Sequence, residues 1–523
     1  RLVRAVGSWA PGSGTPHGEA FALYAPPAPF VKAGRRPGSL LDVGVAIAPD
    51  PDDDGVLFIE ESCPASEAPW RDLPVAVTPA APPRAGSVAV AIEEWGASAA
   101  GDEWPLDAAA DILARVAPRT RSRGLASGDD RVAAVTRTVL DLDDSYLAVQ
   151  GPPGTGKTYL AARVIRDLVL EHQWAIGVVA QSHKVVEHVL RGVVKAGLPG
   201  SLVAKAPPAG GSYGDEPFTV LPPDGHSTFA ARNAHAGYVI GGTAWDLTNL
   251  KRIGRRQLDL LVIDEAGQFS LANTIAVSVA ARNLLLLGDP QQLPQVSQGT
   301  HPAPVDQSAL GYIAGGHPVL PAELGYFLAE SWRMHPEVTL PVSRLAYEGA
   351  LHSAAPPAQR MLQGVAPGLH VVPVDHHDNA TFSVEEAAQV VSLVEQLLGR
   401  LWSSPDEGHA GPLDEQDIIV VTPYNAQVET IRLALAAYPG VRVGTVDKFQ
   451  GQEAVVSIVS LAASSPADVP RGLSFLLSAN RLNVAISRAQ WAAYLLYSPA
   501  LIDYLPATPA GVAELSRFID LVQ

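Results

Sequence analysis

The fold of this chain is decided by one stretch of sequence, Gly151-Pro152-Pro153-Gly154-Thr155-Gly156-Lys157-Thr158. It follows an apolar run at 146–150 that is typical of a buried strand. It precedes residues 159–165, which are apolar at helical spacing. A strand, a glycine-rich loop and a helix in this order form the context of the P-loop motif G-x-x-x-x-G-K-[ST]. We therefore expect a phosphate-binding loop here.

The residue types of this loop fit a chain of phosphates. Its glycines let the backbone turn its N–H groups toward phosphate oxygens, and the N-terminus of the following helix adds partial positive charge. Lys157 is expected to reach the β- and γ-phosphates, and the Thr158 hydroxyl is expected to hold Mg²⁺. The alternative is a chance glycine-rich turn, and the lysine, the threonine and both flanking segments argue against it.

Length and composition exclude several classes of protein and of metal site. The 523 residues predict about three domains. The net charge of −17 argues against a generally basic nucleic-acid-binding surface. It is compatible with a narrow track of basic or polar side chains. A single cysteine, Cys63, excludes a disulfide framework and four-cysteine metal sites. With no apolar run near ~18 residues and no signal-peptide start, we expect a cytoplasmic protein without a membrane partner.

The N-terminal segment, residues 1–95, is rich in proline, glycine and valine. Short β-like runs occur at 43–47, 56–59 and 88–92, and the turn-forming residues 50–55 predict that the first two runs pair as a hairpin. We expect a small β-rich, barrel-like domain. The acidic run at 52–54 is compatible with a metal site, but a solvated turn is favoured.

The next segment, residues 96–328, predicts a doubly wound α/β domain. Two helical stretches lie between residues 107 and 142, and apolar runs typical of buried strands follow the P-loop strand at 176–180, 238–243, 258–263 and 284–287. Strands that alternate with helices at this spacing form parallel sheets. Residues 198–237 contain paired prolines and glycines, and we expect a loop-like insertion there.

A carboxylate pair ends one of these predicted strands. Asp264 and Glu265 follow the apolar run at 258–263, which is the Walker B pattern when it lies downstream of a P-loop. Asp264 is expected to hold Mg²⁺, and Glu265 to orient or deprotonate the attacking water. The alternative is a carboxylate pair that caps the next helix.

A second α/β unit, residues 329–523, has predicted strands at 418–421, 441–445 and 455–459 and no P-loop of its own. Its two ends carry Arg333 and Arg488. Two sheets of nucleotide-binding type imply a cleft between them. Closure of that cleft would bring an arginine onto the charge of a transferring γ-phosphoryl group.

Taken together, these motifs resemble those of superfamily 1 helicases, specifically the 1B (RecD/Upf-type) branch with two RecA-like domains. The chain most resembles the helicase half of bacterial proteins that fuse a RecB-like nuclease to such a motor. The matching motifs, spread in order over about residues 105–500, are GPPGTGKT at 151–158, AQSHK at 180–184, GGTAW at 241–245, DEAGQ at 264–268, GDPQQLPQ at 288–295, SWRMHP at 331–336, VGTVDKFQGQE at 443–453 and LNVAISRAQ at 482–490.

The resemblance implies roles for further residues. Gln292 would sense the γ-phosphate, and Arg333 and Arg488 would be paired arginine fingers. Trp332 would stack on adenine, and Glu453 would meet the ribose. The positions that touch single-stranded nucleic acid in the family are here Ser182, His183, Thr243, Thr422, Pro423, Tyr424 and Asn425. Hydroxyls suit phosphate contacts that do not read sequence, while Tyr424 suits either a base stack or internal packing.

The chain also departs from the family. A glutamine that reads adenine is usual about twenty residues before the P-loop, whereas residues 129–135 contain none, so strict ATP choice is in doubt. The family's nuclease is absent from the sequence. Since the chain opens on Arg1 rather than Met, we expect a processed product or a piece of something longer, and a nuclease domain or subunit outside it is compatible with this. By position, residues 1–95 correspond to a β-barrel that grips nucleic acid.

The resulting expectation is an ATP- and Mg²⁺-dependent motor that translocates on single-stranded DNA and unwinds duplexes, with 5′→3′ polarity implied by the resemblance. Two alternatives stay open. One is an RNA helicase, because the branch acts on either polymer. The other is a nucleotide-switched binding module without unwinding, against which the presence of Glu265 and both arginines argues.

Overall fold

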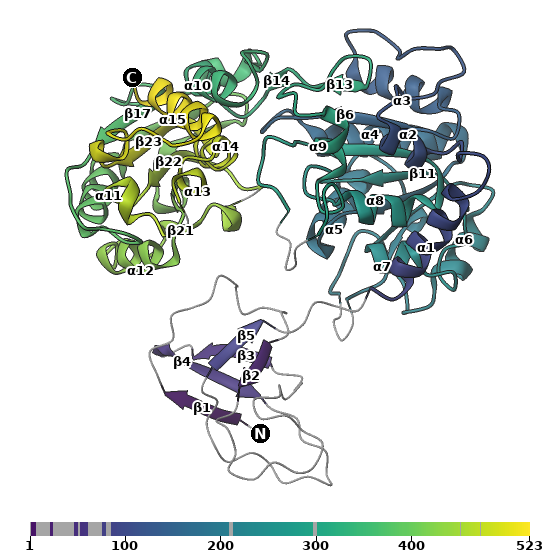
Figure 1. Cartoon of the computed structure of the whole chain (residues 1–523), viewed down its shortest axis with the longest axis horizontal. Helices are drawn as coiled ribbons and strands as arrows, with labels where there is room; N and C mark the ends of the chain where they lie inside the picture. Colours follow the sequence, from purple (N-terminus) through teal and green to yellow (C-terminus); the bar gives the residue numbers. More distant parts are fainter. Residues whose placement is uncertain are drawn as a thin grey trace. The chain divides into compact units, whose positions relative to one another are not determined.

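The computed structural model of the chain describes residues 2–6, 21–24, 46–50, 53–60, 76–79, 85–208, 213–295, 301–449, 451–470 and 472–523. The chain divides into two compact units, Arg1–Arg84 and Ala85–Gln523. Figure 1 shows both units coloured along the sequence and labels many of their elements. In the described residues no helix is long and apolar enough to span a membrane.

The described strands of the first unit form two small antiparallel sheets. Their bounds are β1 Leu2–Val6, β2 Phe21–Tyr24, β3 Ala46–Asp50, β4 Asp53–Glu60 and β5 Ala76–Pro79, in the orders β1-β4-β3 and β2-β5. The predicted hairpin is present as β3 and β4. Residues 43–45 and 51–52 lie outside the described part of the chain, and Asp53 and Asp54 begin a strand rather than occupying a turn.

The second unit begins with an eight-stranded sheet, here called the first sheet. Its strands are β6 Tyr146–Gln150, β7 Ala175–Val179, β8 Val203–Lys205, β9 Thr219–Val220, β10 Tyr238–Gly242, β11 Leu258–Ile263, β12 Ala281–Gly288 and β13 Gly325–Phe327. They run parallel in the order β13-β6-β12-β11-β7-β10-β8-β9. The predicted parallel, doubly wound α/β architecture is confirmed.

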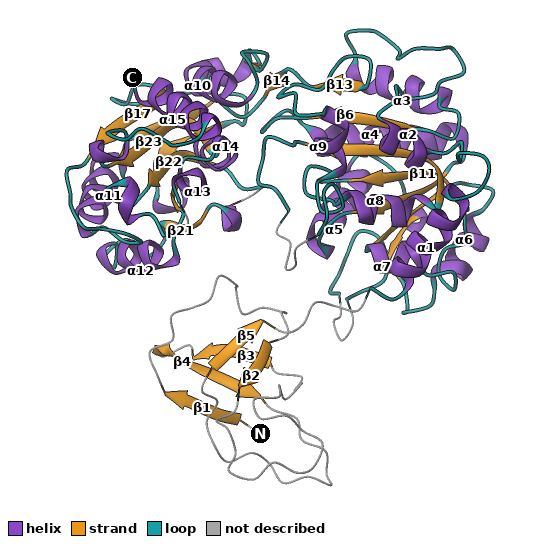
Figure 2. Ribbon diagram, in the orientation of Figure 1, coloured by secondary structure: helices purple, strands orange, loops and turns teal. Residues whose placement is uncertain are grey.

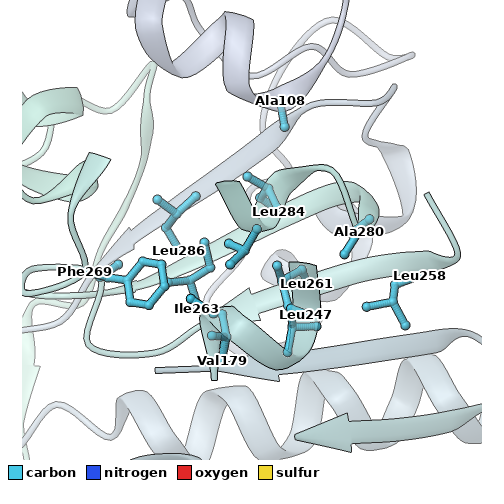
Figure 3. Close-up of a cluster of buried hydrophobic side chains, with 14 of the residues drawn as sticks. Ala108, Val179, Leu247, Leu258, Leu261, Ile263, Phe269, Ala280, Leu284 and Leu286 are labelled. Atoms are coloured by element: carbon cyan, nitrogen blue, oxygen red, sulfur yellow. The ribbon is translucent and has the colours of Figure 1, made fainter. Parts of the chain in front are cut away.

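Helices cover both faces of the first sheet, as Figure 2 shows in purple around the orange strands. One group is α1 Ser87–Ala99, α2 Ala108–Ala114, α6 His226–Asn233, α7 Ala244–Thr248, α8 Leu271–Ser278 and α9 Ala309–Ala314; the other is α3 Arg131–Asp141, α4 Lys157–His172 and α5 His183–Lys195. Alternate residues of β12 face the two groups: Leu284 and Leu286 pack in one core, and Leu285 and Leu287 in the other. Figure 3 shows the first of these cores.

Two expectations for this region are wrong. The predicted strand at 88–92 is part of helix α1, since its buried residues Val88 and Ala91 lie three apart, as one helix face requires. Residues 198–237 are not only loop: they contribute β8, β9, α6 and the 3₁₀ turn Gly200–Leu202. β8 was missed because its three residues end in a buried lysine, Lys205, which breaks the apolar pattern.

A five-stranded parallel sheet, here called the second sheet, has the order β17-β23-β22-β20-β21. Its strands are β17 Gly368–Pro373, β20 Ile418–Thr422, β21 Arg442–Thr445, β22 Ala454–Ser460 and β23 Ala489–Tyr497, and its helices are α10 Pro336–Ala346, α11 Val384–Leu397, α12 Asn425–Ala434, α13 Leu473–Leu476, α14 Ala479–Ile486 and α15 Pro509–Val522. The three predicted strands are confirmed as β20, β21 and β22.

Short strands complete the second half of the chain. β14 Glu330–Ser331 pairs with β15 His352–Ser353, while β16 Met361–Leu362, β18 Leu401–Ser404 and β19 His409–Pro412 form a separate antiparallel sheet, here called the small sheet. Short 3₁₀ turns are present at Pro356–Gln359, Glu415–Asp417, Asp447–Phe449, Pro466–Asp468 and Pro499–Leu501. No motif in the sequence predicted the small sheet.

A core substitution tests this arrangement. Leu286 is fully buried in the core of Figure 3. We expect Leu286→Ala to lower the free energy of unfolding by about 2–5 kcal/mol, because it removes buried methyl groups and leaves a cavity. The control is Leu433→Ala, at a side chain that is 78% exposed, where the expected change is within about 0.5 kcal/mol. Equal effects of the two substitutions in urea unfolding would contradict the packing described here.

Candidate functional site

The P-loop joins β6 to α4 and folds around its own lysine. Gly154 and Gly156 adopt positive φ values of 75° and 80°, which glycine accepts without strain. A Cβ atom on Gly151 would lie 2.3 Å from the Lys157 Cγ, so the close approach also requires glycine there. The Lys157 Nζ donates to the Gly151 carbonyl at 2.5 Å. This cradle of backbone around one cation fits a phosphate chain.

The carboxylate pair lies where β11 ends. Asp264 is buried, and its Oδ1 accepts a 3.0 Å hydrogen bond from the backbone N–H of Glu265. Glu265 has a left-handed backbone with φ of 53°, an arrangement that clusters at functional sites. Burial, followed by the charge of Glu265, raises the pKa of Asp264, whereas Lys157 lowers it. A buried carboxyl next to a half-buried one, beside a lysine, fits a bound cation, which would favour the charged form.

The segment after β12 is bound by the second sheet's helix α14. The side-chain amide of Asn480 donates to the carbonyls of Pro290 and Gln292 at 3.0 and 2.5 Å. The amide of Asn483 donates to the Gln291 carbonyl at 2.8 Å. Gln292 is 6% exposed and lines the site cavity described below. The backbone of this predicted phosphate sensor is therefore fixed by a helix from the other half of the unit.

A buried hydroxyl joins the two halves again. The Tyr347 hydroxyl, on the chain just after α10, donates to Asp289 at 2.6 Å and accepts from the Asn483 amide at 2.8 Å. Asp289 also accepts from the side chain of Gln150 at 3.3 Å. Burial raises the pKa of Asp289, and Lys157 partly opposes this shift. Asp289 and Tyr347 thus link the base of the P-loop to helix α14.

The segment that contains β14 lies directly on the P-loop. The backbone N–H of Trp332 donates to the Gly154 carbonyl at 2.8 Å, and the Ser331 hydroxyl donates to the Pro153 carbonyl at 3.0 Å. A Cβ atom on Gly154 would lie 2.5 Å from the Cβ of Arg333. The Trp332 side chain is 55% exposed, so its ring is accessible at the rim of the site.

The two arginines differ in their surroundings. The Nε of Arg333 lies 2.5 Å from the Glu453 Oε2. Burial raises the pKa of Glu453, but the charge and hydrogen bond of Arg333, together with Gln490 and Arg360, outweigh burial, so the pKa is lowered. Arg488 is 2% exposed and donates to the carbonyls of Val484 and Gln452 at 2.9 and 3.0 Å. Burial, followed by Arg333, lowers the pKa of Arg488.

One cavity of about 760 Å³ collects these side chains. Most of the predicted nucleotide-site residues line it: Pro153, Gly154, Thr155, Gly156, Lys157, Thr158, Asp264, Glu265, Gln292, Trp332, Arg333, Glu453 and Arg488. Gly151 and Pro152, which were also predicted to bind the nucleotide, do not line it. The cavity is therefore lined from both sheets, as expected from the sequence.

Several cavity residues were not predicted. They are Tyr159, Gln181, Lys184, Val185, His188, Gln268, Gly451 and Gln452. Tyr159 is 59% exposed, and the Arg163 guanidinium lies 3.4 Å from its ring centroid. Its position directly after the P-loop was the available signal. Five of the others lie within motifs quoted above, without an assigned role: Gln181, Lys184, Gln268, Gly451 and Gln452. Val185 and His188 lie in helix α5.

The residues predicted to touch nucleic acid do not gather in this cavity, apart from Ser182. Ser182 caps helix α5 by accepting from the Val185 N–H at 3.3 Å, and Thr243 forms a capping box with Asp246. The His183 Nδ1 lies 2.9 Å from the Lys205 Nζ. These side chains lie at the carboxyl ends of β7 and β10, where open α/β sheets bind ligands.

The turn after β20 is more enclosed. Thr422 is fully buried and Tyr424 is 8% exposed, its ring centroid 5.9 Å from that of Phe475. Pro423 and Asn425 are less buried. Of the two roles considered for Tyr424, internal packing therefore agrees with the geometry better than stacking on a base of the nucleic acid.

Residues 129–135, where the family's adenine-reading glutamine is missing, do not line the cavity. Asp130 caps helix α3 by accepting from the Ala133 N–H at 3.1 Å, and Arg131 lies 5.9 Å from the Tyr326 ring centroid. Both are thus engaged with their own surroundings.

Comparison with known proteins gave matches to two models, each described as an AAA domain, over residues 129–309 and 320–498. The chain is 23% identical over 69% of its length to "DNA replication ATP-dependent helicase/nuclease JHS1" of Arabidopsis thaliana, covering 28% of that protein. It is 27% identical over 44% of its length to "Helicase sen1" of Schizosaccharomyces pombe, covering 14%. It is 28% identical over 46% of its length to "DNA-binding protein SMUBP-2" of Mesocricetus auratus, covering 25%. The chain spans less than a third of each relative.

Among solved structures, the chain is similar to an arterivirus nonstructural protein 10 (helicase). The TM-score is 0.42 with 14% identity, covering 95% of this chain and 77% of that one. A structure of such a protein with DNA gives a TM-score of 0.39 and 15% identity, covering 71% of this chain and 63% of that one.

The buried hydroxyl between the two halves can be tested for its contribution to stability. Tyr347→Phe removes one partner each from Asp289 and Asn483. We expect a loss of about 1–3 kcal/mol in the free energy of unfolding, because a buried acceptor loses a donor. The matched control is Tyr438→Phe, whose hydroxyl bonds to Glu395 at 3.1 Å at the surface and should contribute within about 0.5 kcal/mol. Unchanged urea unfolding of Tyr347→Phe would argue against the link.

Proposed function

We propose that this chain, a nucleotide-hydrolysing protein of the superfamily 1 helicase type, is an ATP-driven motor of the 1B branch that moves 5′→3′ along single-stranded DNA and separates duplexes. The observation that carries the proposal is the cavity lined by the P-loop and carboxylate pair of the first sheet and by two arginines from the second half of the chain. The two AAA domain matches and the helicase relatives support the class.

The first sheet would bind and activate the nucleotide. The backbone of residues 151–158 and Lys157 would hold the phosphates, in line with the cradle described above. Thr158 and Asp264 would hold Mg²⁺, which when bound neutralises phosphate charge and polarises the γ-phosphoryl group. Glu265 would orient the attacking water and accept its proton, and Gln292 would contact the γ-phosphate.

The second sheet would complete the site. Arg333 and Arg488 would stabilise the negative charge that develops on the transferring phosphoryl group. The exposed ring of Trp332 would stack on the base, and Glu453 would contact the ribose. Because Asn480 and Asn483 bind the Gln292 segment directly, loss of the γ-phosphate can be passed to helix α14 by contact. Such a coupling is what a motor needs to convert turnover into movement.

Nucleic acid would bind across the carboxyl ends of β7 and β10, at Ser182, His183 and Thr243, and beside the turn at Pro423 and Asn425. Hydroxyl groups and helix N-termini hold phosphates without reading bases. DNA is proposed over RNA because two relatives carry DNA in their names. The N-terminal domain was predicted at residues 1–95, and the first compact unit ends at Arg84. The N-terminal domain is proposed as an accessory domain that grips the strand. The two α/β domains are proposed to divide near residue 328.

The deciding experiment measures ATP hydrolysis with no polymer, with single-stranded DNA and with RNA of the same sequence. We expect strong stimulation by DNA. Equal or greater stimulation by RNA would favour the RNA helicase, and no stimulation by either would favour a nucleotide-switched binding module. Duplexes with a 5′ or a 3′ overhang test polarity, and only the 5′ overhang should support unwinding.

The nucleotide site predicts two separable defects. Lys157→Ala should weaken nucleotide binding, because it removes the cation that meets the phosphates. Glu265→Gln should keep binding and stop turnover, because it removes the base and not the phosphate contacts. Binding of a fluorescent ATP analogue and steady-state hydrolysis measure the two properties. Wild-type hydrolysis by Glu265→Gln would show that another group activates the water.

Nucleotide choice is expected to be relaxed. A base stack on Trp332 accepts any base, whereas discrimination requires hydrogen bonds to the base edge. Since Asp130 and Arg131 are engaged elsewhere, we expect kcat/KM for ATP and GTP to agree within roughly tenfold, which is about 1.4 kcal/mol. Trp332→Ala should lower both to a similar degree. A several-hundredfold preference for ATP would mean that another residue reads adenine.

A further inference from the structure

A buried arginine outside every recognised motif contacts the segment that contains Trp332 and Arg333. Arg360 precedes β16 and is 4% exposed. Its Nη1 donates to the Arg333 carbonyl at 2.5 Å, and its Nη2 lies 3.4 Å from the Trp332 carbonyl. Arg360 itself does not line the nucleotide cavity. It therefore contacts the backbone of two proposed nucleotide-site residues from behind.

The other side of the same guanidinium is held by the small sheet. The turn between β18 and β19 supplies Asp406, whose two carboxylate oxygens lie 3.1 Å from the Arg360 Nε and 2.5 Å from its Nη2. Glu407 adds a contact at 3.1 Å. The bond to Arg360 is the largest of several contributions that lower the pKa of Asp406. One planar cation thus joins this turn to two consecutive peptide carbonyls.

A second chain of contacts leads from the same turn to the same arginine finger. The side-chain amide of Gln490 lies 3.5 Å from a Glu407 oxygen and 3.2 Å from the Glu453 Oε1. Glu453 in turn pairs with Arg333. The small sheet therefore reaches Arg333 twice: at its backbone through Arg360, and at its side chain through Gln490 and Glu453.

We propose that Arg360, held by Asp406 and Glu407 of the β18–β19 turn, is the positioning residue that sets how the Arg333 side chain enters the nucleotide cavity. The proposal rests on the nucleotide-site role of Arg333 proposed above. Only a guanidinium has a planar fork of five donors that can serve a carboxylate and two carbonyls together. A lysine would keep the charge and lose that geometry.

The first test is Arg360→Lys, assayed with DNA present at saturation. Because a misplacement of about 1 Å can cost about 10²-fold in rate, we expect kcat to fall by about that factor. KM for ATP and binding of a fluorescent ATP analogue should change much less, since the P-loop contacts persist. The control is Arg432→Lys. Arg432 lies in the same half of the chain and also bonds to one carboxylate and one carbonyl, Glu429 at 2.8 Å and Val443 at 3.2 Å, and its variant should keep wild-type kcat.

A double-mutant cycle separates positioning from general destabilisation. If Arg360 acts through Arg333, then Arg333→Ala with Arg360→Lys should be no slower than Arg333→Ala alone. Independent losses that multiply would overturn the proposal, as would wild-type kcat in Arg360→Lys. If Arg360→Lys fails to fold, Asp406→Asn is the substitute test, because it weakens the contact between the β18–β19 turn and the Arg360 guanidinium. Asp406→Asn should also lower kcat. An unchanged kcat in this variant would overturn the proposal. A wild-type protein that hydrolyses no nucleotide would instead refute the proposed function.

Discussion

The backbone hydrogen bond from the Trp332 N–H to the Gly154 carbonyl joins the two sheets at the P-loop. It requires glycine at 154, because a Cβ atom there would collide with Arg333. The same glycine supplies the positive φ that the phosphate cradle needs. One residue thus meets two constraints, the shape of the loop and the approach of the second sheet. The same close approach brings Arg333 to the edge of the P-loop.

A second connection lies deeper. Asp289, Tyr347 and Asn483 form a buried chain of hydrogen bonds across the two halves. Polar groups in such a place are costly unless each finds a partner, so the chain favours one arrangement over many similar ones. Asn480 and Asn483 then fix the backbone around Gln292. Gly154 and Gln292 both line the cavity, so a nucleotide bound there would meet groups that are fixed by both connections.

The sequence predicted most of the sheet architecture and of the cavity lining because both follow from local patterns. Apolar runs at strand length locate β6, β11 and β12, and ligands gather where parallel strands end. What it missed depends on tertiary contacts. Helix α1 was mistaken for a strand because a Val-Ala alternation fits either period until burial is known. Arg360 was missed because its partners lie 27 and 46 residues away, and no spacing rule connects them.

The charges around the cavity suggest a reason for the buried arginine Arg488, whose burial opposes folding. Arg488 is almost completely buried, and burial together with the charge of Arg333 lowers its pKa, while Glu265 and Glu453 act in the opposite direction. A buried cation carries a desolvation cost that opposes folding. Asp264 has the converse difficulty as a buried carboxyl beside Glu265. A nucleotide with Mg²⁺ would relieve both, since the phosphates face the arginines and the metal faces the carboxyl. The groups that weaken the free protein are thus the ones that would bind the nucleotide and stabilise its transition state.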